Sequence, residues 1–225
     1  VKSWGGGEKW HFDVASRLHR NGYDAFLIIN RKSELYNRVQ ESPLRVYRIA
    51  ISNLSFLNPF KVLRLRRIFR EEKVKTIIIN LSSDLKAGGI AAKLAGVKNI
   101  IYRRGSAIPI RNTPLNRYLF RHVITRVIAN SEETKRTIVQ RNHKLYDLNK
   151  IEVIYNGINL REYDGAKKHI LFQRKDSEII IGNAGRLVKQ KGHRLLINVA
   201  EILRDRGLKF RVLIAGQGKL ETELR

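Results

Sequence analysis

Short apolar runs alternate with amphipathic stretches along the chain, and this alternation restricts the fold more than any other feature. The apolar runs are brief, rich in β-branched residues and bounded by polar residues or glycine, as buried strands are. They cover residues 24–30, 46–51, 76–80, 99–102, 126–130, 152–155, 178–183 and 209–215. Strands that alternate with helices form a parallel sheet with helices on both faces. The sequence therefore predicts an α/β protein.

Helices are predicted between these strands, because capping residues flank the amphipathic stretches. Asn58 and Pro59 form a helix start, Ser131 is a second cap, and Asn21-Gly22 is a helix stop. The predicted helices cover residues 8–20, 59–73, 87–94, 132–140 and 193–205.

The pattern is interrupted over residues 160–177, which are polar and show no clear period. We therefore expect a first domain over residues 1–159, a linker over 160–177 and the opening of a second α/β domain over 178–225. The chain contains no Met and begins at Val1. We expect a fragment whose first domain lacks its first strand.

The composition restricts the partners. Lys and Arg number 45 against 20 for Asp and Glu, so the net charge is +25. Such a chain is expected to bind anions, whether nucleic acid, phosphorylated metabolites or an acidic membrane surface.

Cys is absent, which excludes disulfides, thiolate nucleophiles and Cys-based zinc sites. No apolar run reaches the roughly 18 residues of a spanning helix, and no signal peptide is recognised. A cytoplasmic location is expected.

Two glycine-containing motifs are suited to phosphate. Gly5-Gly6-Gly7-Glu8 directly precedes a helix, whose first amides and dipole attract anions. In NAGRLVKQKG, Arg186 and Lys191 lie between a strand end and a helix start. This is the edge at which open α/β sheets bind ligands, and a forked guanidinium beside a point charge suits a diphosphate. The alternatives are a tight turn for the first motif and a solvated basic loop for the second.

Other patterns are weak or absent. Gly216 and Gly218 form half of a dinucleotide fingerprint, but Glu221 replaces its third glycine, so NAD binding is poorly supported. No Asp-x-Asp pair exists, and the six His residues lack close metal-ligand spacing. We expect no metal and no cofactor.

Five segments in order resemble the retaining glycosyltransferases of family four, which have the GT-B fold of two Rossmann-like domains. They are GGGEKWHFDVASRLHRNGYDAFLI, ANSEETKRTI, VIYNGIN, NAGRLVKQKG with HRLLINVAEIL, and LIAGQGKLETEL. The resemblance covers nearly the whole chain. It implies that the second domain is cut short and that this fragment alone is inactive.

The resemblance implies a function: a sugar passes from a nucleotide-diphosphate donor to an acceptor, with retention and without a metal. Arg186 and Lys191 would be catalytic, stabilising the leaving diphosphate. Many family members carry a His before a glycine after the fifth strand, and here Arg104 holds that place. Arg104 is therefore expected to contact donor or acceptor. The implied donor-binding positions are Gly6, Gly7, Arg104, Asn156, Gly185, Gly216 and Gly218.

The first domain carries unusual positive charge. Residues 85–131 contain no acid but nine cations: Lys86, Lys93, Lys98, Arg103, Arg104, Arg111, Arg117, Arg121 and Arg126. The helix after Pro59 adds Lys61, Arg64, Arg67 and Arg70. We expect docking on the inner face of the cytoplasmic membrane and a lipid-linked envelope glycan or lipopolysaccharide core as acceptor. The alternatives are an ordinary solvated face, a nucleic-acid binder without a recognition motif, or another nucleotide-binding α/β protein.

Overall fold

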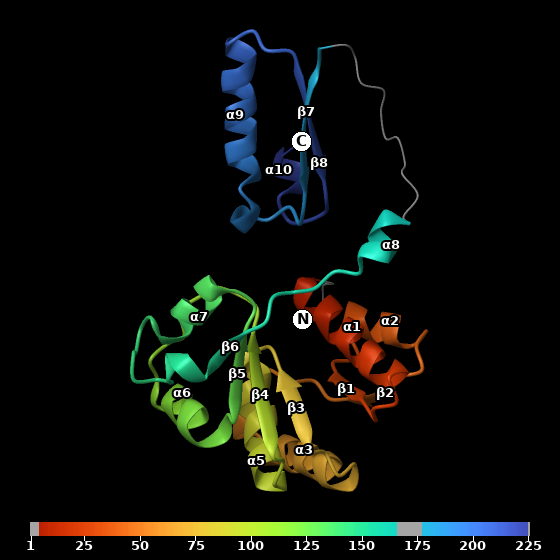
Figure 1. Cartoon of the computed structure of the whole chain (residues 1–225), viewed down its shortest axis with the longest axis vertical. Coiled ribbons are helices and arrows are strands. Elements are labelled where there is room, and N and C mark those ends of the chain that lie inside the picture. The colour runs from red at the N-terminus through yellow and green to blue at the C-terminus, as the bar shows by residue number, and fades with distance from the viewer. Residues whose placement is uncertain (1–4, 166–176, 225) are drawn as a thin grey trace. The chain divides into compact units, whose positions relative to one another are not determined.

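The structure, a computed structural model, describes residues 5–165 and 177–224, and it divides into two compact units. Unit 1 comprises residues 1–158 and unit 2 residues 159–225. Helix α8 (Leu160–Asp164) lies within the predicted linker, and residues 166–176 of that linker lie outside the described residues. Figure 1 shows both units, which are described separately below.

Unit 1 contains two parallel sheets. Strands β1 (Phe26–Ile29) and β2 (Arg45–Arg48) form one pair. A four-stranded sheet has the order β3-β4-β5-β6. Its strands are β3 (Thr76–Ile79), β4 (Asn99–Arg104), β5 (Arg126–Ala129) and β6 (Ile151–Val153). Because all four strands are parallel, their carboxyl ends lie at one edge, as Figure 1 shows.

The predicted strands and helices of unit 1 are confirmed, with small shifts at their ends. The helices are α1 (Gly6–Arg20), α2 (Glu34–Val39), α3 (Pro59–Glu71), α4 (Ser82–Asp84), α5 (Ile90–Ala95), α6 (Pro114–Tyr118) and α7 (Glu132–Val139), with π-helical turns over Leu85–Gly89 and Leu119–Val123. The caps act as predicted. The amide of Lys61 donates to Asn58 Oδ1 over 3.1 Å, and the amide of Thr134 donates to Ser131 Oγ over 3.1 Å.

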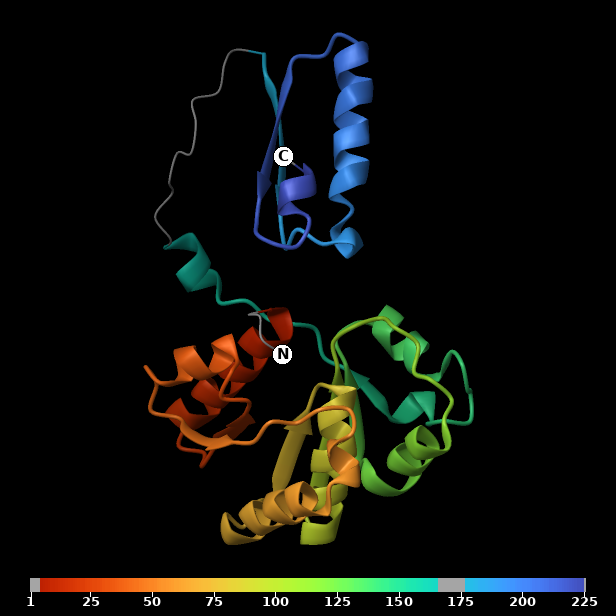
Figure 2. The same ribbon diagram turned by 180° about the vertical axis from the view of Figure 1, so that it is seen from behind.

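Two apolar cores hold unit 1 together. The larger one joins β3–β6 to α3 and α5, and α5 lies over the sheet face seen in Figure 2. Val62, Leu65, Ile68 and Phe69 of α3 are all buried in it. Their spacing of three or four residues forms one helix face. The smaller core lies among α1, β1 and α2, around Leu27, Ile29 and Val39.

Unit 2 consists of the parallel pair β7 (Ile179–Ala184) and β8 (Phe210–Ala215) with helices α9 (His193–Asp205) and α10 (Glu221–Leu224). Among its described residues, Leu187 and His193 are the buried ones. Leu195, Val199 and Ile202 lie at helical spacing along α9, and their side chains are 68%, 39% and 52% exposed. Unit 2 therefore leaves an apolar helix face uncovered.

Candidate functional site

In unit 1, polar side chains follow the carboxyl ends of the four-stranded sheet. Asn80 follows β3, Arg103 and Arg104 end β4, Asn130 follows β5 and Asn156 follows β6. Open parallel sheets bind ligands at this edge. Of this set, the sequence predicts Arg104 and Asn156 as donor-binding residues.

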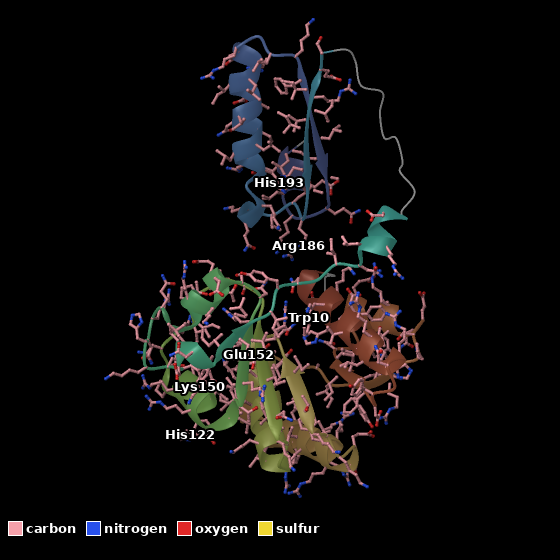
Figure 3. All side chains as sticks on the ribbon, viewed as in Figure 1. Trp10, His122, Lys150, Glu152, Arg186 and His193 are labelled. Carbon is pink, nitrogen blue, oxygen red and sulfur yellow. The ribbon has the colours of Figure 1, made fainter. Side chains whose placement is uncertain are left out.

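Of these five residues, Arg103 is the buried one. It is 4% exposed, and its Nη2 donates to Asn156 Oδ1 over 2.7 Å. Its Cζ lies 4.2 Å from the ring centroid of Trp10, in the first turns of α1, which is labelled in Figure 3. Burial lowers the pKa of Arg103, because the charged form loses solvation. The guanidinium thus joins helix α1 to the segment after β6.

Arg104 points to the other side of the sheet, because neighbouring strand residues alternate between faces. Its Nη1 donates to Tyr102 Oη over 3.2 Å, and its Nη2 donates to the Ile108 carbonyl over 2.7 Å. Tyr102 is buried, and burial raises its pKa. Arg104 therefore braces the loop after β4. Its contact with donor or acceptor stays a prediction, whereas Arg103, which the sequence did not indicate as a site residue, meets Asn156.

The glycine motif forms the start of α1, with Gly5 as the N-cap residue. A Cβ added at Gly6 or Gly7 would meet no atom within 4 Å. The fold therefore does not need glycine at these two positions for space, which is compatible with the predicted donor contact. On the same helix, burial and then the charge of Arg103 lower the pKa of His11 to about 4. His11 is therefore neutral at pH 7.

The segment after β3 adds two polar groups that the sequence did not indicate. Burial raises the pKa of Asp84. Both amide atoms of Asn80 are buried, and neither has a hydrogen-bond partner in the part of the chain that the structure describes. The sequence could have indicated Asp84, because it is the last acidic residue before the acid-free run over residues 85–131. A carboxyl group with a raised pKa at a sheet edge is a candidate for proton transfer or substrate binding.

In unit 2, Arg186 and Lys191 flank the turn between β7 and α9 and are both exposed. Lys191 Cδ and Cε would lie 3.7 Å from a Cβ at Gly185, so the lysine side chain packs over that glycine. Within residues 5–165 and 177–224, no acidic side chain forms a salt bridge with either cation. Two uncompensated cations therefore lie close in sequence at the carboxyl edge of a parallel pair.

The three predicted glycines of unit 2 lie where two loops pack closely. A Cβ at Gly216 would lie 1.9 Å from the Gly185 carbonyl oxygen, and one at Gly218 would lie 2.3 Å from the Leu187 carbonyl oxygen. The amide of Gly185 donates to the Ala215 carbonyl, and that of Leu187 donates to the Gln217 carbonyl. Gly216 and Gly218 thus allow the loop after β8 to pack on the loop carrying Arg186.

His193 contacts the loop that carries Arg186, and the sequence did not indicate it as a site residue. It is 1% exposed, and its Nε2 lies 3.1 Å from the Arg186 carbonyl oxygen. Both residues are labelled in Figure 3. Since the carbonyl accepts, Nε2 carries the proton. His193 is the first residue of α9, and the N-cap residue before it is Gly192, whose φ of +68° favours glycine. His193 therefore fixes the backbone of Arg186.

No group of three or more His, Asp or Glu residues within the described ranges could hold a metal ion. No helix among the described residues has both the length and the apolar character required to cross a bilayer.

The sequence profile described as Glycosyltransferase Family 4 matches residues 4–162, more than half of the chain. The chain belongs to glycosyltransferase family 4. The family resemblance predicted from the five sequence segments is confirmed. No curated protein matches the chain in sequence.

Solved structures share the fold of this family 4 chain. A glycosyltransferase from Rickettsia africae ESF-5 matches 97% of the chain with a TM-score of 0.74 and 19% identity. The lipopolysaccharide outer core galactosyltransferase WaaB matches all of it with a TM-score of 0.67 and 17% identity. MurG from Acinetobacter baumannii matches 95% with a TM-score of 0.55 and 16% identity.

These likenesses show the fold, an α/β arrangement of the GT-B type with parallel sheets, as predicted. The chain spans 58% of the length of the Rickettsia protein, 60% of WaaB and 64% of MurG.

Proposed function

We propose that the full-length protein transfers a sugar from a nucleotide-diphosphate donor to a glycan or glycolipid acceptor, with retention and without a metal ion. Membership of family 4 supports glycosyl transfer. The observation that carries the proposal is the pair of exposed, unpaired cations Arg186 and Lys191 beside Gly185 in the described part of unit 2. Negative charge builds on the leaving diphosphate during transfer, and preorganised cations stabilise it more in the transition state than in the ground state.

A thermal-shift screen of nucleotide-diphosphate sugars against the full-length protein tests the donor class. One donor should raise the melting temperature, because a ligand that binds only the folded state stabilises it by about 2.7 kcal/mol at 100 times its Kd. The matching nucleoside diphosphate should also bind. A DNA mobility-shift arm, run at low and high salt, controls for binding through charge alone. Salt-sensitive DNA binding with no nucleotide effect would favour a nucleic-acid binder.

We also propose that residues 1–225 alone transfer no sugar. The uncovered apolar face of α9 and the scarcity of buried residues in the described part of unit 2 support this, since a unit with so small a core is marginal.

The acceptor is proposed to be lipid-linked and presented at an anionic membrane. The nine-cation run supports this less than its sequence suggests, because it does not form one surface. Arg103 is buried, Arg104 is half-buried against Tyr102, and Arg126 pairs with Glu152 over 3.3 Å. The structural neighbour WaaB is a lipopolysaccharide outer core galactosyltransferase. We include a lipopolysaccharide core acceptor for this protein in the proposal.

Helix α3 and its approach provide the stronger support for membrane docking. Leu57, Phe60 and Leu63 are 66%, 82% and 51% exposed. Arg64, Arg67 and Arg70 are exposed on the same helix, and Arg67 also pairs with Glu71 over 3.2 Å. Residues three and four apart share a helix side, so apolar and basic groups adjoin. We call these six residues the α3 surface. Apolar side chains rimmed by cations suit an anionic bilayer.

Liposome flotation tests the α3 surface. Wild-type protein should bind anionic vesicles and lose binding in 1 M salt, where the Debye length is about 3 Å. The double variant Arg64→Gln, Arg70→Gln should bind about tenfold or more weakly, since each cation contributes about 1 kcal/mol. The double variant Arg141→Gln, Lys144→Gln removes equal charge from another exposed segment and should behave as wild type. Equal binding to neutral and anionic vesicles would contradict docking through this surface.

A further inference from the structure

Arg103 is a buried cation without a carboxylate. It is 4% exposed, and no acidic side chain pairs with it among the described residues. Burying an unpaired charge is costly, and proteins ordinarily pair such charges. The groups around it are uncharged: the Trp10 ring, the Asn156 amide and a neutral His11. The site thus lacks one negative charge.

The guanidinium is also short of hydrogen-bond acceptors. An arginine has five N–H donors. Within the described part of the chain, one hydrogen bond of the Arg103 side chain is seen, from Nη2 to Asn156 Oδ1. Asn156, which accepts this hydrogen bond, and Gly105, which lies next to Nη1, are both exposed. The buried guanidinium therefore adjoins exposed residues at the sheet edge, where a ligand can approach its remaining donors.

Gly105 makes room for this arrangement. A Cβ at Gly105 would lie 2.8 Å from Arg103 Nη1 and 3.6 Å from Cζ. The absence of a side chain at Gly105 therefore leaves room for the guanidinium beside Trp10 and Asn156. Three separate elements, α1, the loop after β4 and the segment after β6, fix the direction of one cationic fork.

We propose that Arg103 binds a phosphoryl group of a substrate, so that unit 1 has an oxyanion site of its own in addition to the pair Arg186 and Lys191. This inference rests on the proposed function, because the reaction's substrates carry phosphate on the donor and, for a lipid-linked acceptor, on the acceptor too. A guanidinium fork matches two phosphoryl oxygens, and an anion supplies both the missing charge and the missing acceptors. Gly6 and Gly7 are the first two residues of α1, the helix that carries Trp10, and the space around them is free of other atoms within 4 Å of an added Cβ.

Isothermal titration with inorganic phosphate tests the site without any transfer reaction. The full-length protein is used with Arg186→Ala and Lys191→Ala, so that unit 2 lacks its two cations. Arg103→Gln in this background should weaken phosphate binding at least tenfold. Arg121→Gln, which removes an exposed cation of unit 1, should change it less than twofold.

Gly105→Ala is the second variant, and it protects the test against a folding defect. Its methyl group would displace the Arg103 guanidinium and no backbone atom, so the melting temperature should change by only a few degrees while phosphate binding falls severalfold. If phosphate does not bind, or binds equally with Arg103→Gln and Gly105→Ala, the inference is overturned and Arg103 only joins α1 to the sheet.

Steady-state kinetics then identify the source of the phosphate. In the otherwise unchanged full-length protein, Arg103→Gln should raise KM for the nucleotide sugar if the donor's diphosphate occupies the site, and for the acceptor if the acceptor's phosphate does. An unchanged KM for both substrates would count against the inference. Phosphate binding that depends on Arg103, in a protein that transfers no sugar, would keep this site and refute the proposed function.

Discussion

Lys191→Ala is expected to lower the turnover of the full-length enzyme about 10²–10³-fold, the usual scale for one preorganised transition-state donor. The lysine is exposed and packs over Gly185 without an ion pair in the described ranges, so its loss removes charge stabilisation and little packing. Initial rates with the identified donor, together with a melting curve, measure both effects.

Lys189→Ala is the matched control, because Lys189 is an exposed lysine on the same short 3₁₀ turn, Lys189–Lys191. It should retain turnover within about twofold. Turnover and nucleotide affinity that both stay within twofold in Lys191→Ala would show that this lysine does not stabilise the diphosphate.

Gly216→Ala is expected to destabilise unit 2 by about 3 kcal/mol or more, the upper range for overpacking, because the clash is with backbone. The new Cβ would lie 1.9 Å from the Gly185 carbonyl oxygen, so one of the two loops would have to move. That movement would also shift Arg186. Urea unfolding monitored by circular dichroism measures the loss.

Gly182→Ala provides the comparison, since a Cβ at that strand position meets nothing within 4 Å. It should be neutral or slightly stabilising. If Gly216→Ala kept the stability of Gly182→Ala but lost nucleotide binding, Gly216 would serve the ligand and not the packing of the loops.

The sequence predicted the strands well because each is a short β-branched run with clear boundaries. It predicted the starts of α3 and α7 because Asn58 and Ser131 make the expected side-chain caps. Short helices α2 and α6 and the π-helical turn over Leu119–Val123 were missed, and the turn over Leu85–Gly89 overlaps a predicted helix without having been predicted as π-helical. They depend on tertiary packing, which local propensity does not encode.

The site was predicted unevenly for a physical reason. Arg103 and Arg104 are adjacent, and a strand sends adjacent side chains to opposite faces, but the sequence alone does not say which face binds substrate. The partners of Arg103 are distant in sequence, at Trp10 and Asn156. His193 was missed because its support of Arg186 is a buried contact with a backbone carbonyl. The acid-free run over residues 85–131 was predicted to carry a basic surface, but the sequence does not show which of its cations are exposed, and Arg103 is buried.

The most direct test of retaining, metal-independent transfer is the anomeric configuration of the product, measured by NMR with the donor from the thermal-shift screen and with EDTA present. The full-length enzyme should form a product with the donor's own anomeric configuration, at a rate that EDTA leaves unchanged. An inverted product would contradict a retaining reaction. Activity that disappears with EDTA and returns with a divalent cation would contradict stabilisation of the leaving diphosphate by Arg186 and Lys191 without a metal.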